Sequence, residues 1–341
     1  MKNKYIFVVV MLCSILLVSF GFTSIYVSSQ DTADDDDFVI VTSFYPMYIA
    51  TMNVVGDTEG VTLKNLSEPQ TGCLHDFQLT PADMKLLSTA DVFVINGGGI
   101  ESFMEEIAMQ YPELIIIEAC EGLELLGDDH SHTQEENHEE LTDEISSVED
   151  EHAQDDAYVH DDDHDHDHGD VNAHAWMSVE LHRKQVEHIA TELARVDTAH
   201  ADKYLSNQKL YDGKLAQLQD KQQAVVKAMA HEDVVLLHCA FDYVAEEYDM
   251  HIAYCMDLDE ERQISAGEVA EVLDAIKEHK VRYILAEELY AKDMCKMLQQ
   301  EVTVQAIYLD PLTRGEYDAD SYLKGMEQNI KLLEEAFSAP N

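Results

Sequence analysis

The chain has 341 residues, which is enough for two domains of ordinary size. Its 69 acidic residues outnumber the 21 basic ones and give a formal net charge of -48 at pH 7. This charge argues against a nucleic acid partner, because negatively charged phosphate backbones bind basic surfaces and repel acidic ones. It suits a divalent cation as partner, a surface that must stay soluble, or both.

The N-terminus resembles an export signal. Lys2 and Lys4 precede an uncharged run over residues 5–22, and polar residues follow it. The run is at the border between a signal-peptide core and a membrane-spanning helix, which needs about 20 apolar residues. The residues before Cys13 lack the small side chains of a lipoprotein cleavage box, so lipidation is not favoured. We therefore predict export, with residues 1–30 as either a cleaved signal peptide or a membrane anchor.

Strands and helices alternate in the first half of the chain. Short β-branched runs predict strands, and the periodic segments between them predict helices. The expected strands are 38–42, 61–66, 91–95 and 114–118, and the expected helices are 45–55, 81–90, 100–110 and 178–196. Alternation of this kind indicates a parallel sheet with helices on both faces. We assign residues 38–196 to an N-terminal α/β lobe, and read the three glycines at 97–99 as a tight turn because no P-loop Lys follows.

An acidic, histidine-rich segment interrupts this lobe at residues 127–170. It contains 19 Asp or Glu, eight His, and no Lys or Arg. So much like charge with so little apolar surface predicts disorder. Histidine and carboxylate side chains at this density bind divalent cations weakly and in many arrangements. We expect an accessory collector or sensor of metal.

A long helical pattern and a second alternating set complete the chain. Residues 197–231 contain one glycine and no proline, and their length predicts a rigid connector. Residues 232–338 form the expected C-terminal lobe. Its predicted strands are 234–237, 251–255, 282–286 and 303–309, and its predicted helices are 241–248, 265–279, 291–300 and 319–337. The predicted fold class is therefore α/β, with two parallel-sheet lobes, one long rigid helix between them, and a ligand site in the cleft between the lobes.

Four polar residues stand at or after the ends of strands or beside the acidic segment. Ligands of open parallel sheets bind outside the carboxyl ends of the strands. Three imidazoles and one carboxylate make a four-coordinate site that suits zinc. The candidate metal ligands are His75, His174, His238 and Asp310.

Four segments resemble the metal-binding solute receptors of ABC transporters, most closely the zinc-specific branch. They are Gly72-Cys73-Leu74-His75-Asp76-Phe77 with the residues up to Asp83, Asn96-Gly97 before Glu101, Asn172-Ala173-His174-Ala175-Trp176-Met177, and His238-Cys239-Ala240-Phe241-Asp242-Tyr243. The resemblance covers residues 38–337. It implies two α/β lobes bridged by a long helix, with His75 and His174 from the first lobe and His238 and Asp310 from the second holding one metal ion.

The chain departs from the family pattern around His174. Family members usually show Asp-Pro-His-x-Trp-Leu-Asp there, and this chain lacks the Pro and the final Asp. His174 keeps its place before Trp176. The fourth ligand varies in the zinc branch, where an acidic loop residue or a water takes it. Manganese-type relatives have a carboxylate where His238 stands, so the resemblance favours zinc.

The six cysteines form no CxxC motif, which gives no support for a zinc ribbon or a thioredoxin-type site. Cys73 and Cys239 adjoin the proposed ligands. Each could bind the metal, pair with the other, or be a small buried residue. Whether any of the cysteines pair stays open.

These features predict an exported, monomeric receptor that captures Zn²⁺ and delivers it to a membrane ABC permease. A surface adhesin, a metal buffer, or a manganese- or iron-specific receptor of the same fold are the alternatives. A metallohydrolase is disfavoured because the chain contains no HExxH motif and no evident general base.

Overall fold

The computed structural model describes residues 37–71, 77–127, 171–227, 229, 231–258 and 264–338. The predicted export segment, nearly all of the acidic segment, Cys73 and His75 lie outside these residues. In the described part of the chain no helix is both long and apolar enough to cross a membrane.

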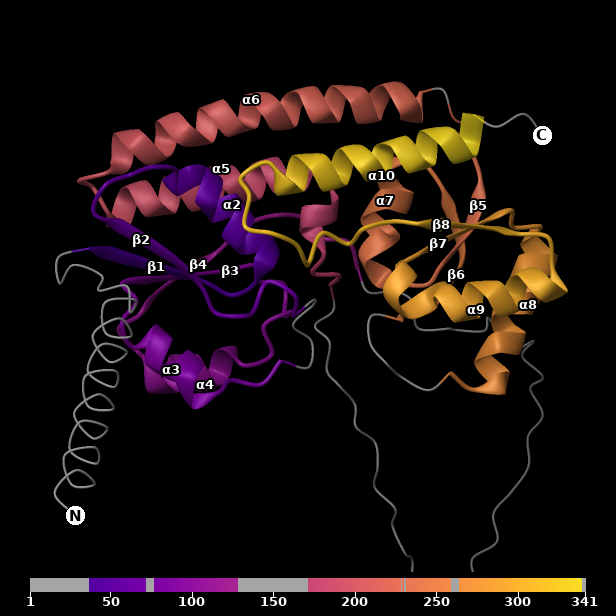
Figure 1. Ribbon diagram of the computed structural model, residues 1–341, viewed down its shortest axis with the longest axis horizontal. Helices are drawn as coiled ribbons and strands as arrows, with labels where there is room; N and C mark the ends of the chain where they lie inside the picture. Colours follow the sequence, from indigo (N-terminus) through magenta and orange to yellow (C-terminus); the bar gives the residue numbers. More distant parts are fainter. Residues whose placement is uncertain are drawn as a thin grey trace, which may run out of the picture.

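Two separate four-stranded parallel sheets organise the molecule (Figure 1). The first has the order β2-β1-β3-β4 and the second the order β6-β5-β7-β8, so the two sheets repeat one topology. The strands of the first sheet are β1 (Phe38–Thr42), β2 (Val61–Asn65), β3 (Val92–Ile95) and β4 (Ile115–Glu118). Those of the second are β5 (Asp233–Leu236), β6 (His251–Cys255), β7 (Tyr283–Ala286) and β8 (Gln305–Tyr308). The predicted α/β class with two parallel-sheet lobes is confirmed.

Helices connect the strands in both lobes. In the first lobe they are α2 (Tyr45–Val55), α3 (Pro81–Leu87), α4 (Met104–Gln110) and α5 (Val179–Val196), with the short 3-10 helix η1 (Ala175–Met177) before α5. In the second they are η2 (Cys239–Phe241), α7 (Asp242–Glu247), α8 (Ala266–His279), α9 (Glu288–Glu301) and α10 (Ser321–Ser338). Thr80 and Ser265 are the N-caps of α3 and α8, and each forms a capping box that satisfies backbone groups at the helix start.

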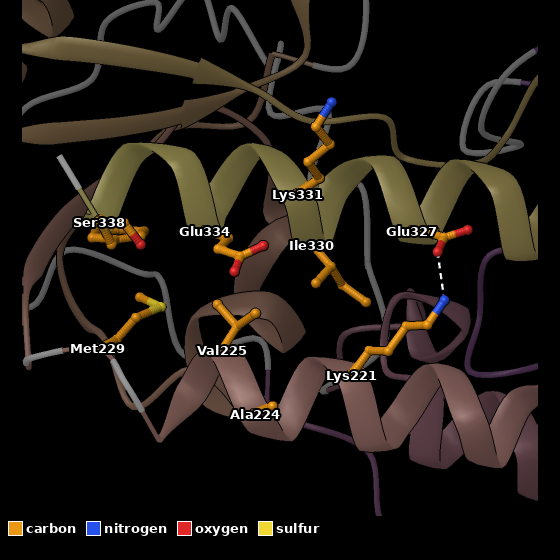
Figure 2. Close-up of a pocket in the computed structure, with 10 residues that line it drawn as sticks. Lys221, Ala224, Val225, Met229, Glu327, Ile330, Lys331, Glu334 and Ser338 are labelled. Carbon is orange, nitrogen blue, oxygen red and sulfur yellow. Dashed lines mark hydrogen bonds and ion pairs between the residues drawn. The ribbon is translucent and has the colours of Figure 1, made fainter.

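The helix α6 (Ala201–Val226) leads from the first lobe to β5 and has 26 residues. It is shorter at both ends than the predicted 197–231. At its start, residues 197–200 form a separate turn, and the side chain of Asp197 accepts hydrogen bonds from His200 and from Tyr204 in the first turn of α6. Figure 1 shows α6 extending above both lobes, with α10 beside its C-terminal part. Ion pairs link the two helices, including Lys221 Nζ to Glu327 Oε1 at 2.5 Å. Near their C-terminal ends they leave a groove of about 490 Å³, shown in Figure 2.

The turn after β3 explains why α4 begins four residues later than predicted. Gly97, Gly98 and Gly99 all have positive φ, which glycine adopts without strain. The buried carboxylate of Glu101 folds back and accepts hydrogen bonds from the amides of Asn96 and Gly97. Residues 100–103 therefore remain non-helical, and α4 begins at Met104 rather than at residue 100.

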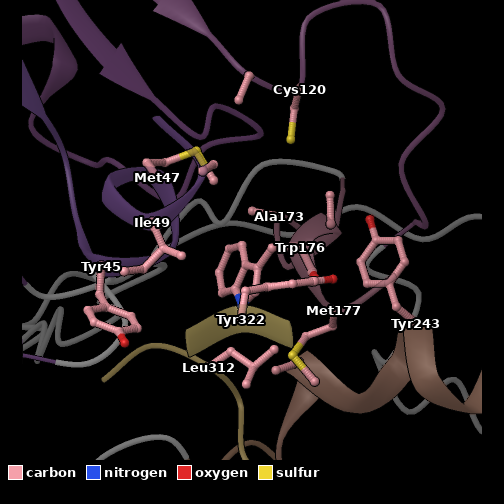
Figure 3. Packing of buried hydrophobic residues seen from close by; sticks show 14 of the residues in the cluster. Tyr45, Met47, Ile49, Cys120, Ala173, Trp176, Met177, Tyr243, Leu312 and Tyr322 are labelled. Carbon is pink, nitrogen blue, oxygen red and sulfur yellow. The ribbon is translucent and has the colours of Figure 1, made fainter. Parts of the chain in front are cut away.

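The largest side chain in the apolar core is Trp176, which is fully buried where the two lobes meet (Figure 3). Its indole packs edge-on against Phe44, with 5.2 Å between ring centroids. Its Nε1 donates to the carbonyl of Pro311 in the second lobe at 2.8 Å. Trp176 thus fixes the segment that carries His174 against both halves of the molecule.

Candidate metal centre

His238 lies two residues beyond the last residue of β5, at the carboxyl end of that strand, and is fully buried. Its Nδ1 lies 3.5 Å from a carboxylate oxygen of Glu287, and its Nε2 lies 4.0 Å from Asp257 Oδ1. Glu287 is itself held by Arg314, whose Nη1 donates to it at 2.9 Å. A carboxylate behind an imidazole orients the ring and raises its basicity as a metal ligand. His238 therefore has the surroundings of a metal-binding histidine.

His174 comes from the segment that precedes η1 and is 1% exposed. The side-chain oxygen of Asn172 accepts a hydrogen bond from the His174 amide and lies 2.9 Å from Nδ1. A proton on Nδ1 donates to this oxygen and leaves Nε2 unprotonated, which is the form of imidazole that binds metals. Asn172 thus orients His174 without the Pro and Asp of the family pattern.

The two histidines meet although 64 residues separate them in the sequence. Their ring centroids are 5.5 Å apart. Together with Cys239 they form a group in which one ligand atom from each residue lies within 4.8 Å of the others. The imidazoles come from different lobes, so a metal bound by both would join the lobes.

Cys239 contributes a sulfur atom to this group. Its Sγ lies 3.8 Å from His174 Nδ1 and 3.2 Å from Asp257 Oδ2. Burial, followed by the charge of Asp257, raises the pKa of the Cys239 thiol well above its usual value. The free protein therefore holds a protonated thiol here, and binding a metal through sulfur releases that proton. The cysteines in the described ranges, Cys120, Cys239, Cys255 and Cys295, are all free thiols.

The segment between Asn172 and Ser178 is clamped to the second lobe. The Asn172 amide group donates to the carbonyl of Cys239 at 2.8 Å and to Asp242 at 2.7 Å. Tyr243 donates to the carbonyl of Asn172 at 2.6 Å. These contacts set the position of His174 relative to His238.

The structure describes only one of the other two predicted ligands. His75 lies outside the described residues. Asp310 is not part of the group formed by His174, His238 and Cys239. Its Oδ1 accepts a hydrogen bond from the amide of Leu312 at 2.8 Å, and burial raises its pKa. It lines a small cavity with Tyr45 and Arg314.

Sequence reasoning missed three residues that shape this site: Asn172, Asp257 and Glu287. Asp257 lies two residues beyond β6, and Glu287 directly follows β7. Both obey the same carboxyl-end rule that pointed to His238. Among many acidic residues in a chain of this charge, nothing else in the sequence distinguished them.

Comparison with known proteins identifies the family. A family model described as zinc-uptake complex component A, periplasmic (ZnuA), matches residues 40–336. The chain is 27% identical to the high-affinity zinc uptake system protein ZnuA of Bacillus subtilis, over 96% of each chain. It is 25% identical to the zinc-binding lipoprotein AdcA of Streptococcus pneumoniae over 94% of this chain, and spans about 60% of AdcA.

Solved structures share the fold. The solute-binding protein FpvC of Pseudomonas aeruginosa, in complex with Ni²⁺, matches with a TM-score of 0.69 and 25% identity, over 89% of this chain and 99% of FpvC. A Zn(II)-bound variant of AdcAII from S. pneumoniae matches with a TM-score of 0.67 and 22% identity, over 89% of this chain and 99% of that one. Since the family model covers most of the sequence, the chain belongs to the family of the periplasmic component A of zinc-uptake complexes.

Proposed function

We propose that this chain is an extracytoplasmic receptor that binds Zn²⁺ with high affinity between its two lobes and delivers it to an ABC-type importer. The observation that carries the proposal is the buried pair of His174 and His238, one from each lobe, with ring centroids 5.5 Å apart. Neutral imidazoles are favoured ligands of zinc. Membership in a family of zinc-uptake components supports zinc as the cargo.

The proposed ligands are His75, His174 and His238, completed by a fourth group. Asp310 is the fourth ligand expected from the sequence. The geometry adds Cys239 as a competitor, since it belongs to the same group of possible ligands as His174 and His238. Thiolate is a soft ligand that favours zinc over manganese. Cys239 would therefore favour zinc over the harder metals.

Release would follow from a shift of the second lobe. His238 and Cys239 move together because both stand at the carboxyl end of β5, whereas His174 belongs to the segment after the first sheet. Separating the lobes removes ligands from the metal without unfolding either sheet. Docking on the importer would supply the free energy for this movement, since only a partner that binds the open form better can favour it.

We propose that the protein acts as a monomer outside the cytoplasm. Its N-terminal segment either anchors it to the membrane or is cleaved off. The family is one of uptake components rather than of enzymes, and we propose that the chain itself catalyses no reaction. A surface adhesin is the alternative function. Two structural neighbours carry laminin-binding names, but at 21% identity they show the fold alone.

Deleting residues 128–169 separates a receptor from a metal buffer. A receptor keeps one tight zinc site and loses only weak ones, because His174 and His238 remain. A buffer loses nearly all of its binding. Calorimetric titration of the full chain and the deletion variant with Zn²⁺, Mn²⁺ and Fe²⁺ measures this. Loss of the tight site on deletion would overturn the receptor proposal, and tighter binding of Mn²⁺ or Fe²⁺ would overturn the choice of metal.

A further inference from the structure

A second group of metal-binding side chains lies at the amino-terminal end of the second sheet. Asp233 and His251 begin β5 and β6 and are partners in the strand register. His251 Nδ1 lies 3.0 Å from Asp233 Oδ1. The ring of His279 lies beside that of His251, with 5.8 Å between centroids. One ligand atom from each of the three residues lies within 4.8 Å of the others.

One pair of atoms in this group already has nearly the spacing of two ligands on one zinc ion. Ligand atoms about 2.0–2.2 Å from zinc in a tetrahedral arrangement stand about 3.3–3.6 Å apart. The contact between His251 and Asp233 already has nearly this length. His279 is exposed, so its ring can approach without disturbing packing. Two imidazoles and one carboxylate leave the fourth position to water, as in zinc sites with three protein ligands.

The local charges favour a cation. His279 is the last residue of α8, where unpaired backbone carbonyls carry partial negative charge. Arg282 is neutralised by its ion pair with Glu232. Asp249, whose carboxylate lies 3.4 Å from His231, adds a further negative charge two residues before His251. Lys280 directly follows His279 and opposes these charges, so we expect moderate affinity.

The group is separate from the site between the lobes. Asp233 is the first residue of β5, and His238 lies beyond its last residue. Five residues of extended strand span about 16 Å. One metal ion therefore cannot contact both groups. The side chains of His251 and Asp233 are 52% and 36% exposed, so metal reaches them from solvent without movement of the lobes.

We propose that Asp233, His251 and His279 form a second, surface site for zinc, weaker than the one between the lobes and filled after it. All three residues belong to the second lobe and lie away from His238. Zinc can therefore bind them whether or not His238 binds the transported metal.

Histidine footprinting tests the proposal on the full chain. Diethyl pyrocarbonate modifies accessible imidazoles, and mass spectrometry reads each residue separately, so histidines of the acidic segment do not interfere. Zinc is expected to protect His251 and His279, and His279→Ala should raise the zinc concentration that protects His251 at least about ten-fold. Substitution of these exposed residues should leave the fold intact.

His188 is the matched control. It lies 3.5 Å from the carboxylate of Glu121 but belongs to no group of three ligands among the described residues. Zinc should not protect it. Protection of His251 should persist in His238→Ala, which separates this site from the proposed transport site. The proposal is overturned if His251 stays reactive at saturating zinc, or if His279→Ala leaves its protection unchanged.

Discussion

The two ends of β5 carry two groups of metal-binding side chains in opposite surroundings. At the carboxyl end, His238 and His174 are 0% and 1% exposed and come from different lobes. At the amino end, Asp233, His251 and His279 belong to one lobe and reach solvent. Burial holds the first pair in place before metal arrives, whereas the exposed side chains must be ordered by the metal itself.

The difference has a functional consequence. Ordering mobile side chains costs affinity, so the buried group is expected to bind more tightly. A metal bridging two lobes also makes affinity depend on how the lobes are arranged. A metal held by one lobe has no such dependence. Of the two proposed sites, only the one at the carboxyl end of β5 would therefore couple zinc binding to release.

The largest expected effect is the loss of tight zinc binding when a buried proposed ligand is removed. His238→Ala is expected to weaken tight zinc binding by at least about 100-fold, since loss of even an outer-shell partner costs about 10–100-fold. The single tryptophan reports binding, because the ring of Trp176 lies 5.0 Å from that of His174. Its fluorescence during competition with a chelator gives the affinity. His251→Ala, at the other end of β5, should leave this affinity unchanged, and equal losses in the two variants would refute the distinction.

Cys239→Ser tests whether a sulfur atom binds the metal at the carboxyl end of β5. Replacing sulfur by oxygen removes a soft ligand, and we expect zinc affinity to fall about ten-fold. The Co²⁺-loaded wild-type protein should show thiolate-to-cobalt charge-transfer absorption that Cys239→Ser lacks. Cys295→Ala removes a thiol buried in a different part of the core and should keep the band. An absent band in the wild type would show that Cys239 does not bind the metal.

Glu101→Gln tests how a buried ionisable group, compared with an exposed one, affects the stability of the fold. Burial raises the pKa of Glu101 from 4.5 to about 7. The folded protein keeps a proton that the unfolded chain loses, so this group's contribution to stability is full below about pH 4.5 and is lost as pH rises through about 7. Glutamine cannot ionise, and it has only one accepting oxygen. It therefore leaves one of the backbone amides of Asn96 and Gly97 without its hydrogen bond. The substitution should lower the free energy of unfolding by about 1–2 kcal/mol at pH 5.

The difference between Glu101→Gln and the wild type should narrow towards pH 8, where the wild-type carboxyl also loses its proton. Urea unfolding between pH 5 and pH 8 measures it. Glu105→Gln, at an exposed position of α4, is the control and should change neither the stability nor its pH dependence. A gap that widens with pH would contradict the raised pKa of Glu101.

Most of the secondary structure was predictable because it depends on local chemistry. The β-branched run at 38–42 forms a strand as expected, and the helix predicted at 265–279 is α8, which Ser265 and Glu268 cap. The start of α4 was not predictable. Glu101 stabilises a non-helical turn by accepting hydrogen bonds from two amides four and five residues earlier, and helical periodicity carries no sign of such a contact.

The site was predictable in part. The rule for carboxyl ends of parallel strands singled out His238, and the motif around Trp176 singled out His174. The same rule also gave Asp310, which the structure places beside Leu312 rather than within the group of His174, His238 and Cys239. Position at a strand end limits where a residue can lie, but not which way its side chain points.

By itself, the sequence determined the α/β class, the family, and the acidic, metal-attracting character of the chain, since composition, periodicity and motifs are local properties. Only the tertiary structure decided which side chains meet. His174 approaches His238 because Asn172 and Trp176 bind the second lobe, and His279 approaches His251 because α8 ends beside β6. Such contacts join residues far apart in the chain, and packing of the whole molecule fixes their distances.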